Sequence, residues 1–176
     1  RFTAQALTDL SIENRQLVLV EGGIQAGFSP FRRADDDETT HSVRLNLQGD
    51  RFYFDFNNSH LKPEARDYLR SMGAYLKQHL DSWEALHVEG HTDERGSDAY
   101  NLMLSKARAK AVMKAIVEGG APKERVGFEG FSFHQPRVNE KTEAAYRENR
   151  RVELKFSGLS NKPEFTQGLD RLKKKP

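Results

Sequence analysis

The chain has 176 residues, of which 36% are hydrophobic and 31% charged, a balance typical of a globular domain with a well-hydrated surface. The formal net charge of +2 is too small to indicate a nucleic-acid-binding protein, which needs a clustered basic face. The absence of cysteine excludes disulfides and cysteine metal sites, and no apolar run is long enough to cross a bilayer.

The first part of the chain, residues 1–41, is predicted to be an N-terminal extension or linker. One strand is possible within residues 12–23, but residues 28–41 are rich in turn formers and in blocks of like charge. Because the chain begins at Arg1 and shows no secretory signal, we expect a processed protein or an excised segment.

From Ser42 onward the pattern is more regular. The stretches Val43–Leu47 and Phe52–Phe56 alternate around Gly49-Asp50, which predicts a β-hairpin. Residues 61–80 carry apolar side chains at steps of three and four, and Pro63 suits a first helical turn. A short strand is then expected at residues 85–90.

A second long helix is predicted from its N-cap at Ser97 to its C-terminal stop at Gly119. We expect its buried stripe to include Tyr100, Leu104, Ala107, Ala111 and Ala115.

Strands are predicted at residues 125–130 and 150–156, with a short helix near residues 142–148 between them. The tail, residues 157–176, contains prolines, glycines and a lysine run, and is predicted to be flexible and basic. The order β-β-α-β-α-β-β predicts an α/β (α+β) two-layer sandwich, residues 42–156, in which both helices cover one face of a mixed sheet.

Two charged residues flank the start of the second helix. Asp93 follows the 85–90 strand, and Arg108 lies about three turns into the helix. Loops at strand ends are where ligand sites concentrate. A carboxylate and a guanidinium together suit a zwitterionic amino-acid head. The alternative is that Asp93 and Arg108 pair with each other or with water.

A metal site is a further alternative. His87, His91 and Asp93 stand at even spacing and would share one side of an extended strand. Two histidines and a carboxylate can hold zinc. The sequence offers no general base to accompany them, so solvated histidines are the preferred interpretation, and no metal or other cofactor is predicted.

The run GHTDERGSDAYNLMLSKARAKAV, residues 90–112, closely resembles the signature of the OmpA-like C-terminal domain family. Three other blocks agree in order: FYFDFNNSHLKPEA, GFEGFSFHQP and ENRRVEL. The resemblance covers about residues 45–156. It implies binding rather than catalysis, with peptidoglycan as the partner.

In such domains a loop aspartate and a helix arginine hold the free amino-acid end of meso-diaminopimelate in the peptidoglycan stem peptide. The resemblance places these roles on Asp93 and Arg108. It adds further residues around the same groove: Thr92, Asn101, Asn57, Leu104 and Arg150. Asn57 stands where many members carry aspartate, so a role that needs charge there is in doubt.

The resemblance therefore implies a non-enzymatic domain in the periplasm of a Gram-negative bacterium, associated with the outer membrane. It would tether that membrane or an envelope complex to the cell wall, with other envelope proteins as possible partners. Two alternatives stay open. One is a stator-like or assembly anchor that mainly oligomerises. The other is a peptidoglycan-modifying enzyme that uses the histidine group to hold zinc.

Overall fold

A computed structural model describes residues 19–20, 23–24, 41–47, 53–55 and 57–173. Four strands form one mixed sheet in the order β3-β6-β4-β5. Strand β6 runs antiparallel to both of its neighbours, while β4 and β5 are parallel. The strands are β3 (Val43–Leu47), β4 (Ala85–His91), β5 (Val126–Gly130) and β6 (Arg151–Ser157).

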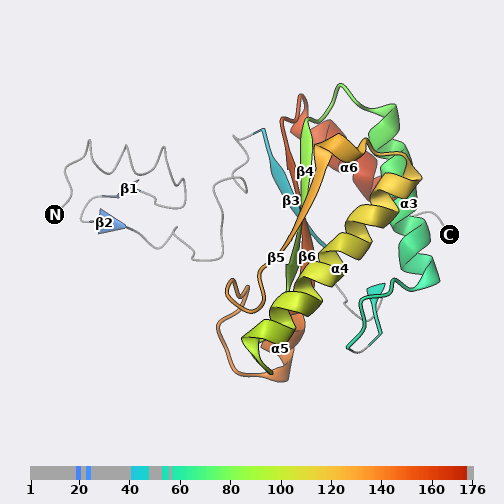
Figure 1. The fold of residues 1–176 in the computed structure, drawn as a ribbon. Helices are drawn as coiled ribbons and strands as arrows, with labels where there is room; N and C mark the ends of the chain where they lie inside the picture. The colour runs from blue at the N-terminus through green and yellow to red at the C-terminus, as the bar shows by residue number, and fades with distance from the viewer. Residues whose placement is uncertain (1–18, 21–22, 25–40, 48–52, 56, 174–176) are drawn as a thin grey trace.

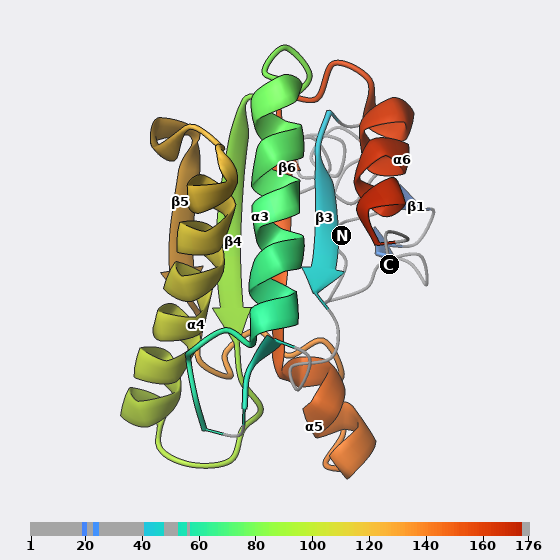
Figure 2. The same ribbon diagram turned by 90° about the vertical axis from the view of Figure 1, so that its right-hand side faces the viewer.

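Three helices lie on the same side of this sheet: α3 (Pro63–Gln78), α4 (Asp98–Gly119) and α6 (Lys162–Leu172). Figure 1 views the sheet close to edge-on with these helices to its right, and Figure 2 shows α3 and α4 in front of the strands and α6 to the side of β3. Alternate side chains of the central strands, such as Val88 and Leu154, point into this layer and are fully buried. The predicted two-layer sandwich is confirmed.

Glycines allow the helical layer to pack closely. A Cβ atom on Gly73 of α3 would lie 1.9 Å from the carbonyl oxygen of Ile116 in α4. A Cβ on Gly90 of β4 would lie 2.0 Å from the carbonyl oxygen of Ser105. Both positions exclude any side chain, so α4 sits directly on α3 and on the end of β4.

The predicted hairpin is wrong over the described residues. Strand β3 pairs with β6, while Phe54 makes only an isolated bridge to Leu61. Phe52 and Phe56 lie outside the described residues. Tyr53 and Phe54 are 7% and 2% exposed, so two consecutive side chains of this segment are buried in the core. A hairpin strand with one solvent-facing side would bury only alternate side chains.

The buried stripe of α4 is also shifted from the prediction. Tyr100 is 37% exposed, and only Ala115 of the predicted set is fully buried. The first half of the helix instead buries the polar residues Asn101, Ser105 and Arg108. Apolar periodicity could not locate this face because its members are hydrophilic.

The prediction of a flexible tail is wrong as far as residue 173. Residues Lys162–Leu172 form α6, whose N-cap Asn161 accepts a hydrogen bond from the amide of Glu164. Phe165 is 1% exposed and packs against Phe156 with their ring centroids 5.0 Å apart. The helix therefore belongs to the core.

The remaining connections are short elements. The turn η2 (Lys123–Arg125) leads into β5, and α5 (Glu143–Asn149) precedes β6, where a short helix was predicted. Strands β1 (Leu19–Val20) and β2 (Gly23–Ile24) pair antiparallel, where one strand was expected.

The domain boundaries proposed from the sequence remain a prediction. Among the described helices, none combines the length and apolarity that a membrane span requires.

Candidate ligand-binding site

The candidate residues gather at one end of the sheet. Asp93 follows β4 and Arg150 immediately precedes β6, and His91 and Arg151 are paired in the antiparallel register. Helix α4 starts at the same end, where Ser97 caps it by accepting a hydrogen bond from the amide of Tyr100. Figure 2 shows this end at the bottom, where α5 and the first turns of α4 lie.

Asp93 is held by two arginines. Its Oδ1 accepts hydrogen bonds from the backbone amide of Arg95 at 3.0 Å and from Arg95 Nε at 3.2 Å. Its Oδ2 accepts from Arg95 Nη2 at 2.9 Å and from Arg150 Nη1 at 2.8 Å. Burial alone would raise the pKa of Asp93, but these bonds hold it below its usual value. The carboxylate is therefore ionised at neutral pH.

Arg108 approaches the site from α4 and is only 5% exposed. Its Nε donates a hydrogen bond to the carbonyl oxygen of Asn58 at 3.0 Å, and its guanidinium lies 4.9 Å from the centre of the Phe54 ring. Asn57 adopts a φ of 55°, a left-handed conformation that asparagine tolerates better than most residues. Asn57 thus shapes the turn that meets Arg108.

The alternative that Asp93 and Arg108 neutralise each other is not what the structure shows, because the Asp93 carboxylate binds Arg95 and Arg150. Arg150, one of the residues that the resemblance placed around the groove, contacts Asp93 directly. Asn101 is 4% exposed, and its Nδ2 donates to the carbonyl oxygen of Arg95 at 2.8 Å. Its observed role is to fix the loop.

The other two predicted residues, Leu104 and Thr92, lie close to Arg108 and Asp93, respectively, along the chain. Leu104 is half-buried one helical turn before Arg108. Thr92 is 5% exposed, and its amide donates to the carbonyl oxygen of Ser132 at 2.8 Å. The Thr92 hydroxyl is buried and has no hydrogen-bond partner among the described residues.

Arg95 is the main residue that the sequence reasoning missed. Besides its bonds to Asp93, its Nη1 donates to Glu143 Oε1 at 2.6 Å, and its guanidinium lies 4.6 Å from the centre of the Tyr146 ring. Half of the Arg95 side chain is exposed. The sequence signal for Arg95 was its position two residues after the candidate Asp93. Its partners in α5, Glu143 and Tyr146, are distant in the sequence and could not be recognised from it.

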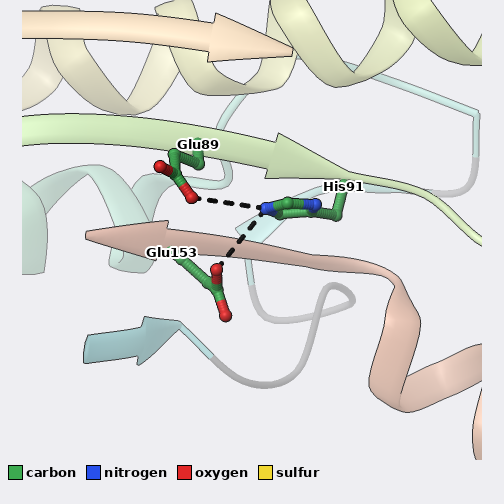
Figure 3. Close-up of side chains that lie close together, drawn as sticks. All are labelled: Glu89, His91 and Glu153. Carbon is green, nitrogen blue, oxygen red and sulfur yellow. Dashed lines mark ion pairs between the residues drawn. The ribbon is translucent and has the colours of Figure 1, made fainter. Parts of the chain in front are cut away.

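The predicted alternative metal group is not assembled. His87 Nε2 lies 3.4 Å from Glu129 on the exposed sheet surface, and Asp93 is engaged by arginines. His91 instead faces Glu89 and Glu153, with its Nε2 at 3.7 Å and 3.5 Å from their Oε2 atoms (Figure 3). One potential ligand atom from each of these three residues lies within 4.8 Å of the others.

The charge balance of this second cluster favours a structural role. Arg44 Nη1 lies 2.7 Å from Glu89 Oε2 and 3.3 Å from Glu153 Oε2, and Arg151 Nε donates to Glu153 Oε1 at 3.2 Å. Two guanidinium groups thus neutralise two carboxylates. A divalent cation would add two uncompensated charges in a buried place.

The same neighbours control the ionisation of Glu153. Its burial would raise the pKa, but the adjacent His91 ring and the charges of Arg151 and Arg44 hold it far below the usual value. By strand alternation the cluster lies on the sheet face opposite α3 and α4, and its ion pairs link β3, β6 and β4.

Residues 53–150 match the model of the OmpA family. The matched segment is more than half of the chain and contains every predicted site residue. The chain belongs to the OmpA family. Membership confirms the resemblance that the motif around residues 90–112 indicated.

Individual relatives agree with this assignment. The chain is 38% identical over 104 residues to the peptidoglycan-associated lipoprotein of Pseudomonas aeruginosa, covering 59% of this chain and 60% of that protein. It is 37% identical over 106 residues to outer membrane protein A of Bordetella avium, covering 60% of this chain and 54% of that protein. The chain thus spans less than two thirds of the length of these relatives.

Solved structures of OmpA-family and related domains share the fold. The peptidoglycan-associated lipoprotein of Burkholderia pseudomallei aligns with a TM-score of 0.53 and 27% identity, over 73% of this chain and 100% of that chain. A periplasmic domain of Helicobacter pylori MotB aligns with a TM-score of 0.58 and 18% identity, over 80% of this chain and 91% of that chain. The second likeness concerns the fold alone.

Proposed function

We propose that this OmpA-family domain binds peptidoglycan non-covalently through the meso-diaminopimelate of the stem peptide. As a binding domain rather than an enzyme, it would tether the outer membrane or an envelope complex to the cell wall of a Gram-negative bacterium. The names of the relatives support the partner, since one is a peptidoglycan-associated lipoprotein and another an outer membrane protein. The site chemistry supports the particular ligand.

The observation that carries the proposal is a pair of opposite charges buried at one end of the sheet. Asp93 and Arg108 are 6% and 5% exposed. Buried charges are rare unless they are paired, because their desolvation is costly. Here both sit beside loops, where an incoming ligand can replace existing contacts.

Diaminopimelate presents the complementary charges. Its distal carbon carries an ammonium and a carboxylate, whereas lysine carries only the ammonium at the corresponding end. The ammonium would bind Asp93, and the carboxylate would bind the planar guanidinium of Arg108. A hydrogen bond to a charged group contributes about 1.5–3 kcal/mol, so two such contacts can support binding in roughly the micromolar range.

Binding to isolated sacculi tests the proposal. The protein should sediment with peptidoglycan of the diaminopimelate type, less with the lysine type, and free diaminopimelate should compete. Because Asp93 and Arg108 are buried, the conservative variants Asp93→Asn and Arg108→Lys are preferable to alanine. Loss of a charged partner typically costs about 2–5 kcal/mol, so affinity should fall at least thirtyfold.

Arg66→Ala is the matched control, because it removes an exposed charge on α3 that pairs with Glu118. Circular dichroism and thermal unfolding should show that all variants remain folded. Wild-type affinity in folded Asp93→Asn and Arg108→Lys proteins would refute the assignment of the ligand to these two residues. Equal retention on both types of sacculi would refute the proposal that Arg108 recognises the distal carboxylate of diaminopimelate.

A further inference from the structure

Arg150 is the more deeply buried of the two arginines that bind Asp93. Its side chain is 18% exposed, against 50% for Arg95, and its Nη1 donates to Asp93 Oδ2 at 2.8 Å. Its amide donates to the carbonyl oxygen of Tyr146 at 3.0 Å and so closes the last turn of α5. A binding site keeps its geometry when the groups that support it are locked by further hydrogen bonds. The residues on either side of Arg150 supply such bonds.

Asn149, the residue before Arg150, is buried and bonds to the loop between β5 and α5. Its Oδ1 accepts hydrogen bonds from the amides of Arg137 and Val138 at 2.7 Å and 2.9 Å. Its Nδ2 donates to the carbonyl oxygen of Val138 at 2.8 Å. Both acceptor positions of the amide oxygen are thus filled by the loop. The Asn149 side chain supplies this stretch with the backbone hydrogen bonds that a neighbouring strand would otherwise provide.

Arg151, the residue after Arg150, bonds to the same loop. It is buried, and its Nη2 donates to the carbonyl oxygen of Gln135 at 3.0 Å. Its Nη1 donates to the carbonyl oxygen of Asn149 at 3.2 Å, which ties the three consecutive residues together. The backbone that carries Arg150 is therefore fixed on both sides by the loop.

The loop also contacts the segment that carries Asp93. The Thr92 amide donates to the carbonyl oxygen of Ser132, near the start of the loop, at 2.8 Å. One part of the loop is therefore bonded to the end of β4 and another part to the start of β6. Asp93 and Arg150 are held by one hydrogen-bonded unit, although they come from different strands.

Asn149 is the better of the two flanking residues for isolating the support of Arg150. Arg151 also donates to Glu153 Oε1 at 3.2 Å, so changing it would disturb the buried charge cluster as well. Asn149 carries no charge, and the three side-chain bonds described above all go to the loop. The effect of changing Asn149 should therefore reach Asp93 through the backbone that carries Arg150.

We propose that Asn149 is a positioning residue for ligand binding, which fixes the backbone that carries Arg150 and thereby the orientation of Asp93. The inference rests on the proposed function, because it takes the Asp93 carboxylate to bind a ligand ammonium. Without the Asn149 side chain, Arg150 would adopt several orientations instead of one, and Asp93 would lose a constant partner. Ordering these groups again on binding would reduce the affinity.

Calorimetric titration of the full chain with free diaminopimelate tests this role. Asn149→Ala should weaken the affinity about tenfold, as loss of an outer hydrogen-bond partner does at metal sites. Asn149→Ser should weaken it less, because a hydroxyl can still accept from one of the loop amides, and this variant serves if Asn149→Ala fails to fold. Asn139→Ala, a change at an exposed asparagine of the same loop, should have no effect.

Two comparisons separate positioning from a general loss of stability. Leu169→Ala removes a buried side chain of α6, which lies away from α5 in Figure 2, so it should lower the melting temperature and leave the affinity unchanged. The second comparison is a double-mutant cycle. In an Arg150→Ala background, Asn149→Ala should cause no further loss of affinity, because its effect passes through the Arg150 side chain. A full additive loss in that background would overturn the positioning role.

The titration of the Asp93 carboxyl group, followed by NMR, gives a readout that needs no ligand. Burial raises the pKa of Asp93, but the hydrogen bonds from Arg95 and Arg150 hold it below its usual value. Asn149→Ala should move this pKa toward the usual value, and it should not do so in the Arg150→Ala background.

The two readouts distinguish failure of the positioning role from failure of the proposed function. An unchanged affinity together with an unchanged Asp93 pKa in folded Asn149→Ala would overturn the positioning role. Failure of the wild-type chain to bind diaminopimelate would overturn the proposed function instead. In that case, a response of the Asp93 pKa that depends on Arg150 would still support the positioning of Asp93 by Asn149.

Discussion

Arg95 supplies three of the four hydrogen bonds that Asp93 accepts, and Arg150 supplies the fourth. An ionised carboxylate offers about four acceptor positions, so Asp93 is saturated. A ligand ammonium must therefore displace a guanidinium. The Arg95 side chain is the one placed to move, because it is half exposed and keeps Glu143 and Tyr146 as alternative partners.

Removing the Arg95 side chain should therefore strengthen ligand binding. In Arg95→Ala two side-chain bonds to Asp93 are lost, while the backbone amide of residue 95 still donates to Oδ1. We expect the affinity for free diaminopimelate to rise roughly tenfold, about 1.4 kcal/mol, as measured by calorimetry. Arg147→Ala, an exposed change on α5, is the control. Weaker binding by Arg95→Ala would show that Arg95 contacts the ligand instead of competing with it.

Glu153 should make the stability of the fold sensitive to acid. Its folded-state pKa lies below the unfolded value of 4.5, so its ionised form stabilises the fold at pH values above 4.5. That stabilisation is lost as the pH falls through the folded-state pKa. Glu153→Gln should cost about 3–5 kcal/mol at pH 7, because it leaves buried guanidinium charge uncompensated.

Urea unfolding at pH 7, 5 and 3 measures this dependence. The difference between the wild type and Glu153→Gln should be similar at pH 7 and 5 and smaller at pH 3. Glu129→Gln, on the same sheet face but 57% exposed at its side chain, should show little difference at any of these pH values. A constant difference for Glu153→Gln would mean that its ionisation does not stabilise the fold.

Gly90→Ala should damage the fold and the site together. The new methyl group would overlap the carbonyl oxygen of Ser105, so α4 would have to move away from β4 and carry Arg108 with it. Overpacking typically costs about 1–3 kcal/mol, and a clash with backbone belongs at the upper end or beyond. Gly127→Ala is the control, because its Cβ would meet only the His87 ring at 3.3 Å. Equal melting temperatures for the two variants would contradict this account.

Phe165→Ala should show that α6 belongs to the core. The side chain is 1% exposed, and deleting a buried phenylalanine typically costs about 3–5 kcal/mol. Gln167→Ala, an exposed change in the same helix, should have little effect. Chemical denaturation gives the comparison. If Phe165→Ala were as stable as the wild type, α6 would not be part of the core, and the flexible tail predicted from the sequence would be the better description.

The elements that the sequence predicted well have local signals. Strand β4 alternates, and α3 repeats its apolar residues at helical spacing with Pro63 in the first turn. Helix α6 carries comparable signals, with Asn161 as N-cap and Phe165 and Leu169 on one face. The basic composition of the tail concealed them. The hairpin prediction was wrong because the burial of Tyr53 depends on tertiary packing.

The residues of the candidate site also divide into those that have a local sequence signal and those that do not. Asp93 and Arg108 could be selected from the resemblance, because they lie within one continuous motif. The bonds of Arg95 could not be predicted, because Glu143 is 48 residues away in the chain. The sequence was equally unable to show that the buried Thr92 hydroxyl has no hydrogen-bond partner within the described part of the chain, since only the folded chain shows how buried groups are paired.

The antiparallel register has a mechanical consequence. Val43 and Ser157 lie at the end of the sheet opposite His91, and the Leu159 amide bonds to the carbonyl oxygen of His41 at that same end. A pull between residue 41 and a ligand on Asp93 would therefore run along the strands. The β3–β6 hydrogen bonds would be loaded in shear, all of them together, instead of opening one after another from an end. Such an arrangement resists extraction of β3 under tension while leaving the ligand free to exchange when the load is absent.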